Sequence, residues 1–162
     1  MDAVTIKLAG PEDAAKVLAF LRQAATESNA VQVPHLLDVS LEQEAENIKT
    51  INQFDDCVVM LAILGDEPVG IITVMMLADH PEVGELGVVV EKKYWRNGIG
   101  QLLVDEAEYW FENYSSLKKL VLSVFADNSP AIALYKKLHF KETGTAVEDG
   151  RPALVMEYQP EE

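Results

Sequence analysis

The sequence has little cysteine: Cys57 is the only one among 162 residues. A lone cysteine cannot form a disulfide within the chain. The apolar residues that follow it, Val58, Val59 and Met60, indicate a buried thiol. Both features favour the reducing cytoplasm as the compartment of this protein.

Long apolar runs are also missing. No stretch approaches the ~18–20 residues that a membrane-spanning helix needs. The segment Met1–Val4 shows no basic region followed by an apolar core. We therefore expect no membrane association and no secretory signal.

Basic residues are scarce: 13 lysines and arginines stand against 27 aspartates and glutamates, which gives a net charge of −14. This charge opposes nucleic acids and anionic membranes as partners. The acidity either serves solubility alone or mildly favours a cationic substrate such as an amine. The histidines, His35, His80 and His139, are scattered without the spacing of metal ligands, so we expect no bound metal.

Apolar residues make up 49% of the chain, enough for one domain with a substantial core, which we expect to span residues 1–162. Their spacing predicts elements in the order β-α-α-β-β-β-α-β-α-β-β. The predicted strands cover residues 4–8, 57–64, 69–77, 84–90, 119–125, 140–145 and 153–158, and the predicted helices begin near residues 11, 40, 99 and 129. Turn sequences at 65–68, 79–82 and 149–150 indicate hairpins.

The crossover at residues 84–125 should be right-handed and should leave its two strands parallel, whereas the hairpins pair antiparallel. The predicted fold class is therefore α/β, with a mixed, mostly antiparallel sheet flanked by helices. Residues 29–39 contain Pro34 and little periodicity, so they are predicted to form a loop or a broken helix.

The chain is organised around a strand that runs through a glycine turn into a helix. Val88–Val90 is a β-branched apolar run, and Asn97-Gly98-Ile99-Gly100 opens a helical pattern. The apolar residues of that pattern are Ile99, Leu102, Leu103, Ala107, Trp110 and Phe111, with Asp105, Glu106, Glu108 and Glu112 mostly on the other side. The free N–H groups of such a helix start can hold a phosphate, although the glycines taken alone favour a plain turn.

Two helix starts carry capping signals. Ser40 and Gln43 form a capping-box pattern. Ser129 is a natural N-cap, with Pro130 at the first helical position.

A second motif is more specific. Residues 128–140 read Asn-x-x-Ala-x-x-Leu-Tyr-x-x-x-x-Phe, about thirty residues after the strand–Gly-x-Gly–helix unit. With both motifs in this order, the chain resembles the GNAT superfamily of acetyl-CoA-dependent N-acetyltransferases. The motifs match over residues 84–140, and residues 1–57 match in element order only.

The resemblance implies that acetyl-CoA lies in a V-shaped gap between the parallel strands 84–90 and 119–125. Its pantetheine arm would pair with the free edge of Val88, Val89 and Val90 like an added strand. The pyrophosphate would rest on backbone N–H groups of Arg96, Asn97, Gly98, Ile99, Gly100 and Gln101. Asn128 would hydrogen-bond the pantetheine, and Tyr135 would direct its hydroxyl at the thioester sulfur and act as the proton donor.

The chemistry that follows is direct attack of an amine on the acetyl carbonyl. A protonated amine must first lose a proton, and Glu85, on the strand that forms the gap, is our candidate base. The chain departs from the family pattern at Trp95, where arginine or glutamine is usual, at His139, where glycine is usual, and at Ser123, where some members carry an acid. Because Ser123 is not acidic, the assignment of Glu85 stays open.

Blander interpretations stand beside these roles. Tyr135 fits core packing, Asn128 fits a helix cap, and Glu85 fits a solvated strand residue. At the level of the whole protein, a non-catalytic acyl-CoA sensor or scaffold and an unrelated phosphate-binding α/β protein are the alternatives. The amine acceptor, whether small molecule or peptide, is not readable from the sequence, and exposed sheet edges make a homodimer possible.

Overall fold

The computed structural model describes residues 3–27, 39–95 and 97–160. One seven-stranded sheet in the order β1-β2-β3-β4-β5-β7-β6 forms its centre. The strands are β1 (Val4–Leu8), β2 (Val58–Leu64), β3 (Glu67–Leu77), β4 (His80–Val90), β5 (Lys119–Phe125), β6 (Phe140–Glu148) and β7 (Arg151–Tyr158). The helices are α1 (Ala14–Glu27), α2 (Leu41–Ile51), α3 (Ile99–Asn113) and α4 (Ser129–Lys137), with single 3-10 turns η1 (Pro11–Asp13) and η3 (Lys92–Tyr94).

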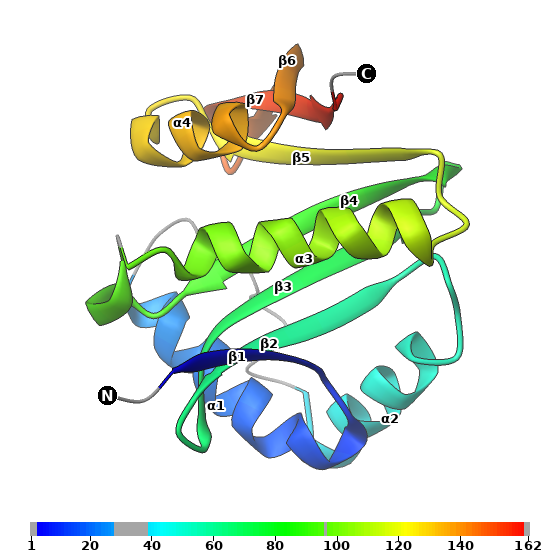
Figure 1. Cartoon of the computed structure of the whole chain (residues 1–162), viewed down its shortest axis with the longest axis vertical. Coiled ribbons are helices and arrows are strands. Elements are labelled where there is room, and N and C mark those ends of the chain that lie inside the picture. The colour runs from blue at the N-terminus through cyan, green and yellow to red at the C-terminus, as the bar shows by residue number, and fades with distance from the viewer. Residues whose placement is uncertain (1–2, 28–38, 96, 161–162) are drawn as a thin grey trace.

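This arrangement confirms the predicted α/β fold class and element order. The pair β4–β5 is parallel, and the other strand pairs of the described sheet are antiparallel. Figure 1 shows α3 lying along the central strands and α4 beside β5, β6 and β7. Helices α1 and α2 lie at the opposite end of the view from α4.

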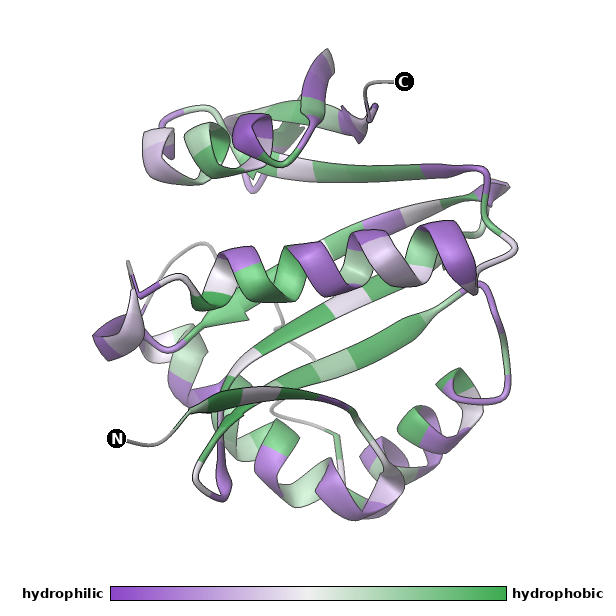
Figure 2. Ribbon diagram, in the orientation of Figure 1, coloured by the Kyte–Doolittle hydropathy of each residue, from purple (hydrophilic) through white to green (hydrophobic). Residues whose placement is uncertain are grey.

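The helices cover the two faces of the sheet, and each face has its own apolar cluster. One cluster joins α3 and α4 to residues such as Val74, Leu86 and Leu120. The other joins α1 and α2 to Val59, Ile71 and neighbours on β2 and β3. The strands between the layers are hydrophobic along most of their length, as Figure 2 shows, because both faces are covered.

The parallel pair β4–β5 is joined over three residue pairs only, and the last of them is Glu85↔Val121. Beyond this point β4 continues to Val90 against β3, and β5 continues to Phe125 against β7. The two strands therefore meet at one end and diverge at the other (Figure 1), which confirms the predicted splay.

Several predicted boundaries were wrong. Strand β4 begins at His80, because only Ala78 and Asp79 form the turn and Leu77 pairs with His80. A register shift after Met76 accommodates Pro81, which cannot donate to the ladder. Strands β6 and β7 reach the predicted turn at Asp149 and Gly150, both with positive φ, and are therefore longer than predicted.

The two capping predictions had different outcomes. The Ser40 hydroxyl accepts the Gln43 N–H at 3.0 Å, which is one half of the predicted capping box, whereas the Gln43 side chain donates to Asn47 Oδ1 at 2.9 Å. The N-cap of α4, however, is Asn128 and not Ser129: Asn128 Oδ1 accepts the Ala131 N–H at 3.3 Å. Asn128 therefore performs the capping role that the sequence assigned to its neighbour.

The predicted faces of α3 were wrong at two residues. Leu102 is 45% exposed, whereas Glu108 is only 8% exposed. Glu108 lies one turn after the buried Val104, so the inward face of α3 includes it. Because Glu108 is acidic and closely follows Asp105 and Glu106, the sequence pattern places it on the solvated face. Its burial depends on tertiary packing that periodicity does not show.

Candidate active site

A cavity of about 530 Å³ opens where β4 leaves β5. Its walls come from the end of α1, the end of β4, the turn that follows, the first turn of α3, and α4. The predicted residues that line it are Val88, Val89, Val90, Gly98, Ile99, Gly100, Gln101, Asn128 and Tyr135. Two segments far apart in sequence thus meet at one cavity.

The splay leaves one edge of β4 with unpaired backbone groups. The Glu91 N–H donates to the Val69 carbonyl at 2.9 Å, so the backbone N–H and C=O groups of Glu91 point toward β3. Backbone groups along a strand point alternately to its two sides. Val89 therefore also faces β3, whereas the N–H and C=O groups of Val88 and Val90 face the cavity. This edge can pair with an extended, amide-bearing ligand.

The start of α3 presents a second group of donors. Gly98 is the N-cap and has φ +83°, a left-handed conformation that glycine adopts without strain. The N–H groups of Ile99, Gly100 and Gln101 belong to the first turn and have no intrahelical partner. The helix dipole adds positive potential there, so this end of the cavity suits an anionic group such as a phosphate.

Tyr135 lies on the α4 wall, only 9% exposed. Its ring packs edge-to-face against Phe140, with centroids 6.0 Å apart. Burial raises the pKa of the hydroxyl to about 12, so the phenol holds its proton at neutral pH.

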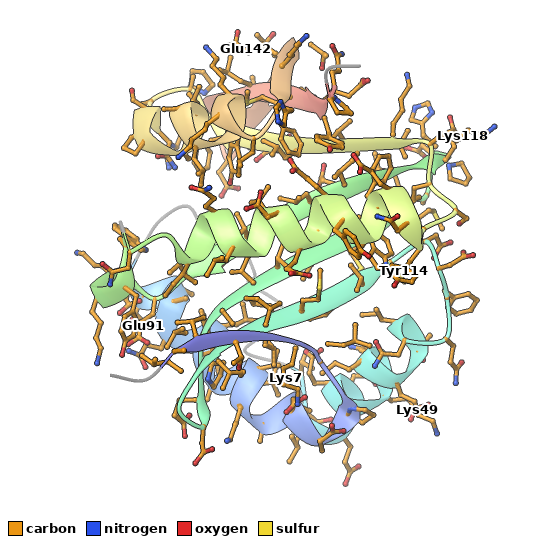
Figure 3. All side chains as sticks on the ribbon, in the orientation of Figure 1. Lys7, Lys49, Glu91, Tyr114, Lys118 and Glu142 are labelled. Atoms are coloured by element: carbon orange, nitrogen blue, oxygen red, sulfur yellow. The ribbon has the colours of Figure 1, made fainter. Side chains whose placement is uncertain are left out.

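Glu85 lies at the closed end of the splay, paired with Val121, and does not line the cavity. The side chains of Glu85 and Val89, four residues apart on β4, point to the same face of the sheet. Val89 packs on the α1–α2 side, whereas Tyr135 belongs to the α3–α4 side. Glu85 and Tyr135 are thus on opposite faces. Burial, and then the nearby Glu148 carboxylate, raise the pKa of Glu85. Figure 3 marks the two ends of this region, with Glu91 at the open end of β4 and Lys118 just before β5.

A family model described as acetyltransferase (GNAT) family matches residues 19–140 of this sequence. The chain belongs to the GNAT acetyltransferase family. It is an N-acetyltransferase of that family, whose members use acetyl-CoA. The alternative of an unrelated phosphate-binding protein is therefore wrong.

This GNAT protein is similar to proteins of several organisms. The L-amino acid N-acetyltransferase AaaT of Escherichia coli K12 is 26% identical over 147 residues, covering 90% of this chain and 87% of the relative. The structure of a GNAT acetyltransferase from Streptococcus pneumoniae is 27% identical, with a TM-score of 0.87 and coverage of 96% and 98% of the two chains. The paia N-acetyltransferase of Thermoplasma acidophilum, solved with coenzyme A, is 20% identical with a TM-score of 0.76, over 98% of this chain and 99% of that one, and shares the fold.

The remaining predicted cofactor-binding residues of the GNAT site are Arg96 and Asn97. Asn97 follows the η3 turn without lining the cavity, and Arg96 falls outside the described residues. Among the described residues, no group of histidine, cysteine, aspartate and glutamate side chains could hold a metal ion. The described helices also include none with the length and apolar character to cross a membrane.

Sequence reasoning missed three side chains around the GNAT cavity. Glu27 of α1 accepts the Lys92 N–H at 3.1 Å and so ties α1 to the η3 turn. Lys137 Nζ donates to Gln101 Oε1 at 3.3 Å, which brings a cation to the first turn of α3. Trp95 lines the cavity and donates its indole N–H to the Val90 carbonyl at 2.7 Å. The periodicity of the sequence does not predict these contacts, although Trp95 was noted as a departure from the family motif.

Proposed function

We propose that this protein transfers the acetyl group of acetyl-CoA to a primary amine of a small molecule or peptide, by direct attack within a ternary complex. The observation that supports this most is the coincidence, in one cavity, of a free β4 edge, the open N-terminus of α3 and the buried hydroxyl of Tyr135.

In this proposal the cofactor spans the cavity from end to end. The amides of the pantetheine arm pair with the backbone of Val88 and Val90, and the pyrophosphate accepts hydrogen bonds from backbone N–H groups between Gly98 and Gln101. Asn128 uses its Oδ1 to cap α4, which leaves its amide N–H groups to meet the pantetheine. Capping and cofactor contact are therefore compatible roles for the same side chain.

The proposed reaction forms an N–C bond at the acetyl carbonyl and breaks the C–S bond. The substrate ammonium first loses a proton to Glu85, directly or through water, and the free amine then attacks. The nitrogen gives up a second proton to water as the C–S bond breaks, the departing sulfur receives the proton of Tyr135, and water returns a proton to the phenolate. Backbone N–H groups of the splayed β4 edge hold the developing oxyanion. Since Glu85 and Tyr135 lie on opposite faces of the sheet, base and acid act from opposite sides of the reacting carbon.

The environment of Glu85 supports its role as a base. A carboxylate whose pKa is raised toward neutrality accepts a proton more readily than one with an ordinary pKa. Burial and Glu148 supply that shift.

The first acceptors to test are α-amino groups of amino acids, because the relative AaaT is named as an L-amino acid N-acetyltransferase. The net charge of −14 also suits polyamines and other cationic amines. We further propose a cytoplasmic location, consistent with the single free cysteine, Cys57, and a possible homodimer formed through an exposed sheet edge.

Calorimetric titration with acetyl-CoA, followed by a free-thiol release assay over a panel of amino acids, polyamines and peptides, tests the proposal. We expect binding, and thiol release that depends on one class of amine, with the acetylated product identified by mass spectrometry. Failure to bind at millimolar acetyl-CoA would contradict the proposed function. Binding without release across the panel would favour the sensor or scaffold alternative.

A further inference from the structure

The indole of Trp95 occupies a backbone group that a cofactor on β4 would otherwise use. Val90 directs its carbonyl into the splay, as the alternation from Glu91 shows. The Trp95 Nε1–H donates to that carbonyl at 2.7 Å, which is a short and well-formed hydrogen bond. The free edge of β4 therefore includes both backbone groups of Val88 but only the N–H of Val90.

Core packing does not account for Trp95. Trp95 is 47% exposed, on the turn that follows β4. The Lys92 ammonium lies 5.9 Å from the ring centroid, and the backbone N–H of Trp95 donates to the Lys92 carbonyl at 3.1 Å. Local contacts within residues 90–95 thus hold the ring against the end of β4, at the wall of the cavity.

We propose that Trp95 is a positioning residue that fixes the register of the cofactor on β4; this inference rests on the proposed function. Strand-like pairing repeats every two residues, so a ligand that pairs with β4 can slip by one repeat, about 6.8 Å. A slip toward Glu91 keeps the pairing only if the Val90 carbonyl is free. Because the Trp95 indole occupies the Val90 carbonyl, it prevents this slipped register and keeps the thioester near Tyr135.

The kinetic signature of a lost register differs from that of a lost contact. In a Trp95→Phe variant the aromatic wall remains and the Val90 carbonyl becomes free. Acetyl-CoA can then bind in a slipped, non-productive register as well as in the productive one. Non-productive binding lowers kcat and the acetyl-CoA KM by the same factor and leaves kcat/KM unchanged. We expect a fall of about 2- to 10-fold in both, the factor that one hydrogen bond of ~0.5–1.5 kcal/mol represents.

Steady-state kinetics of Trp95→Phe test the proposal, with Trp110→Phe as the control. Trp110 lies on α3, outside the cavity walls, so that variant should match the parent. A parallel fall of kcat and KM in Trp95→Phe supports the register role. A raised KM with lower kcat/KM, or no change, would overturn it.

A measurement on the parent protein covers the case in which Trp95→Phe does not fold. The two tryptophans give two indole N–H signals in an NMR spectrum. The hydrogen bond to Val90 should slow hydrogen exchange of the Trp95 indole. Exchange should stay slow when coenzyme A is bound, because the ligand does not displace the indole from Val90. Loss of protection would overturn the proposal, whereas failure of the parent to bind coenzyme A would contradict the proposed function instead.

Discussion

At the scale of single residues, the hydroxyl of Tyr135 has the most specific role in the account. Removing it in Tyr135→Phe should lower kcat by about 100-fold, the lower end of what general acids contribute. Acetyl-CoA affinity should change little, because the ring and its packing against Phe140 remain. Thiol release kinetics and calorimetry measure the two effects separately. Tyr109→Phe, on the exposed side of α3, is the control; equal losses in both variants would remove Tyr135 from the chemistry.

The sequence identified residues of this kind only where a motif named them. Tyr135 and Asn128 were found through the spacing of residues 128–140, and both line the cavity. Glu27 and Lys137 were not found, because their contacts join elements far apart in the chain. Asn128 also shows a limit of local rules: Ser129 is an equally good cap by type, yet Asn128 takes the N-cap position.

At the scale of the elements, the two glycines between β4 and α3 have different roles: Gly98 shapes the turn, and Gly100 leaves room beside the first N–H groups of α3. Gly98 needs its positive φ of +83°, so Gly98→Ala should lower the free energy of unfolding by about 1–2 kcal/mol. Gly100 is helical, and a Cβ there would meet Leu134 at an ordinary 3.6 Å. Gly100→Ala should therefore leave stability equal or slightly higher, yet weaken acetyl-CoA binding because the methyl group stands beside the phosphate donors.

Urea unfolding and calorimetry on both variants check this pair of outcomes. Unchanged acetyl-CoA affinity in Gly100→Ala would argue against a phosphate at this helix start. Unchanged stability in Gly98→Ala would argue against a requirement for the left-handed turn.

The elements themselves were largely predictable, since each strand or helix had its own period of apolar residues. The ends were less so. Pro81 and Glu82 look like turn residues, yet they lie in β4 because the turn closes within Ala78 and Asp79 and a register shift accommodates Pro81. The divergence of β4 from β5 was expected from the family resemblance, since no local pattern in either strand announces it.

At the scale of the whole molecule, Glu108 should make stability depend on pH. Burial, then Asp105 and Glu112 on the same helix, raise its pKa to about 8, and Glu108 Oε2 has no hydrogen-bond partner among the residues that the structure describes. Tyr158 of β7, which donates a hydrogen bond to Glu112, faces the same cluster. The folded state therefore holds the Glu108 proton more tightly than the unfolded state does.

The sign of this effect follows from the raised pKa. The stabilisation is fully present below the unfolded pKa of about 4.5 and is lost as pH rises toward 8. Glu108→Gln keeps a neutral side chain, so its advantage over the parent should grow by about 1–2 kcal/mol between pH 5 and pH 8.5, after allowance for solvent screening. Urea titrations at the two pH values measure it, with Glu106→Gln as the control. A constant difference between parent and Glu108→Gln would refute the assignment.

The central claim is that acetyl-CoA lies along the edge of β4 that the splay leaves unpaired, and residue-level hydrogen exchange tests it most directly. Backbone alternation supplies an internal control, because the Val88 and Val90 amides face the cavity and the Val89 amide already faces β3. Saturating acetyl-CoA should slow exchange at Val88 and Val90 by about tenfold or more and leave Val89 unchanged. Unchanged exchange at Val88 and Val90 while calorimetry shows the ligand bound would contradict the account.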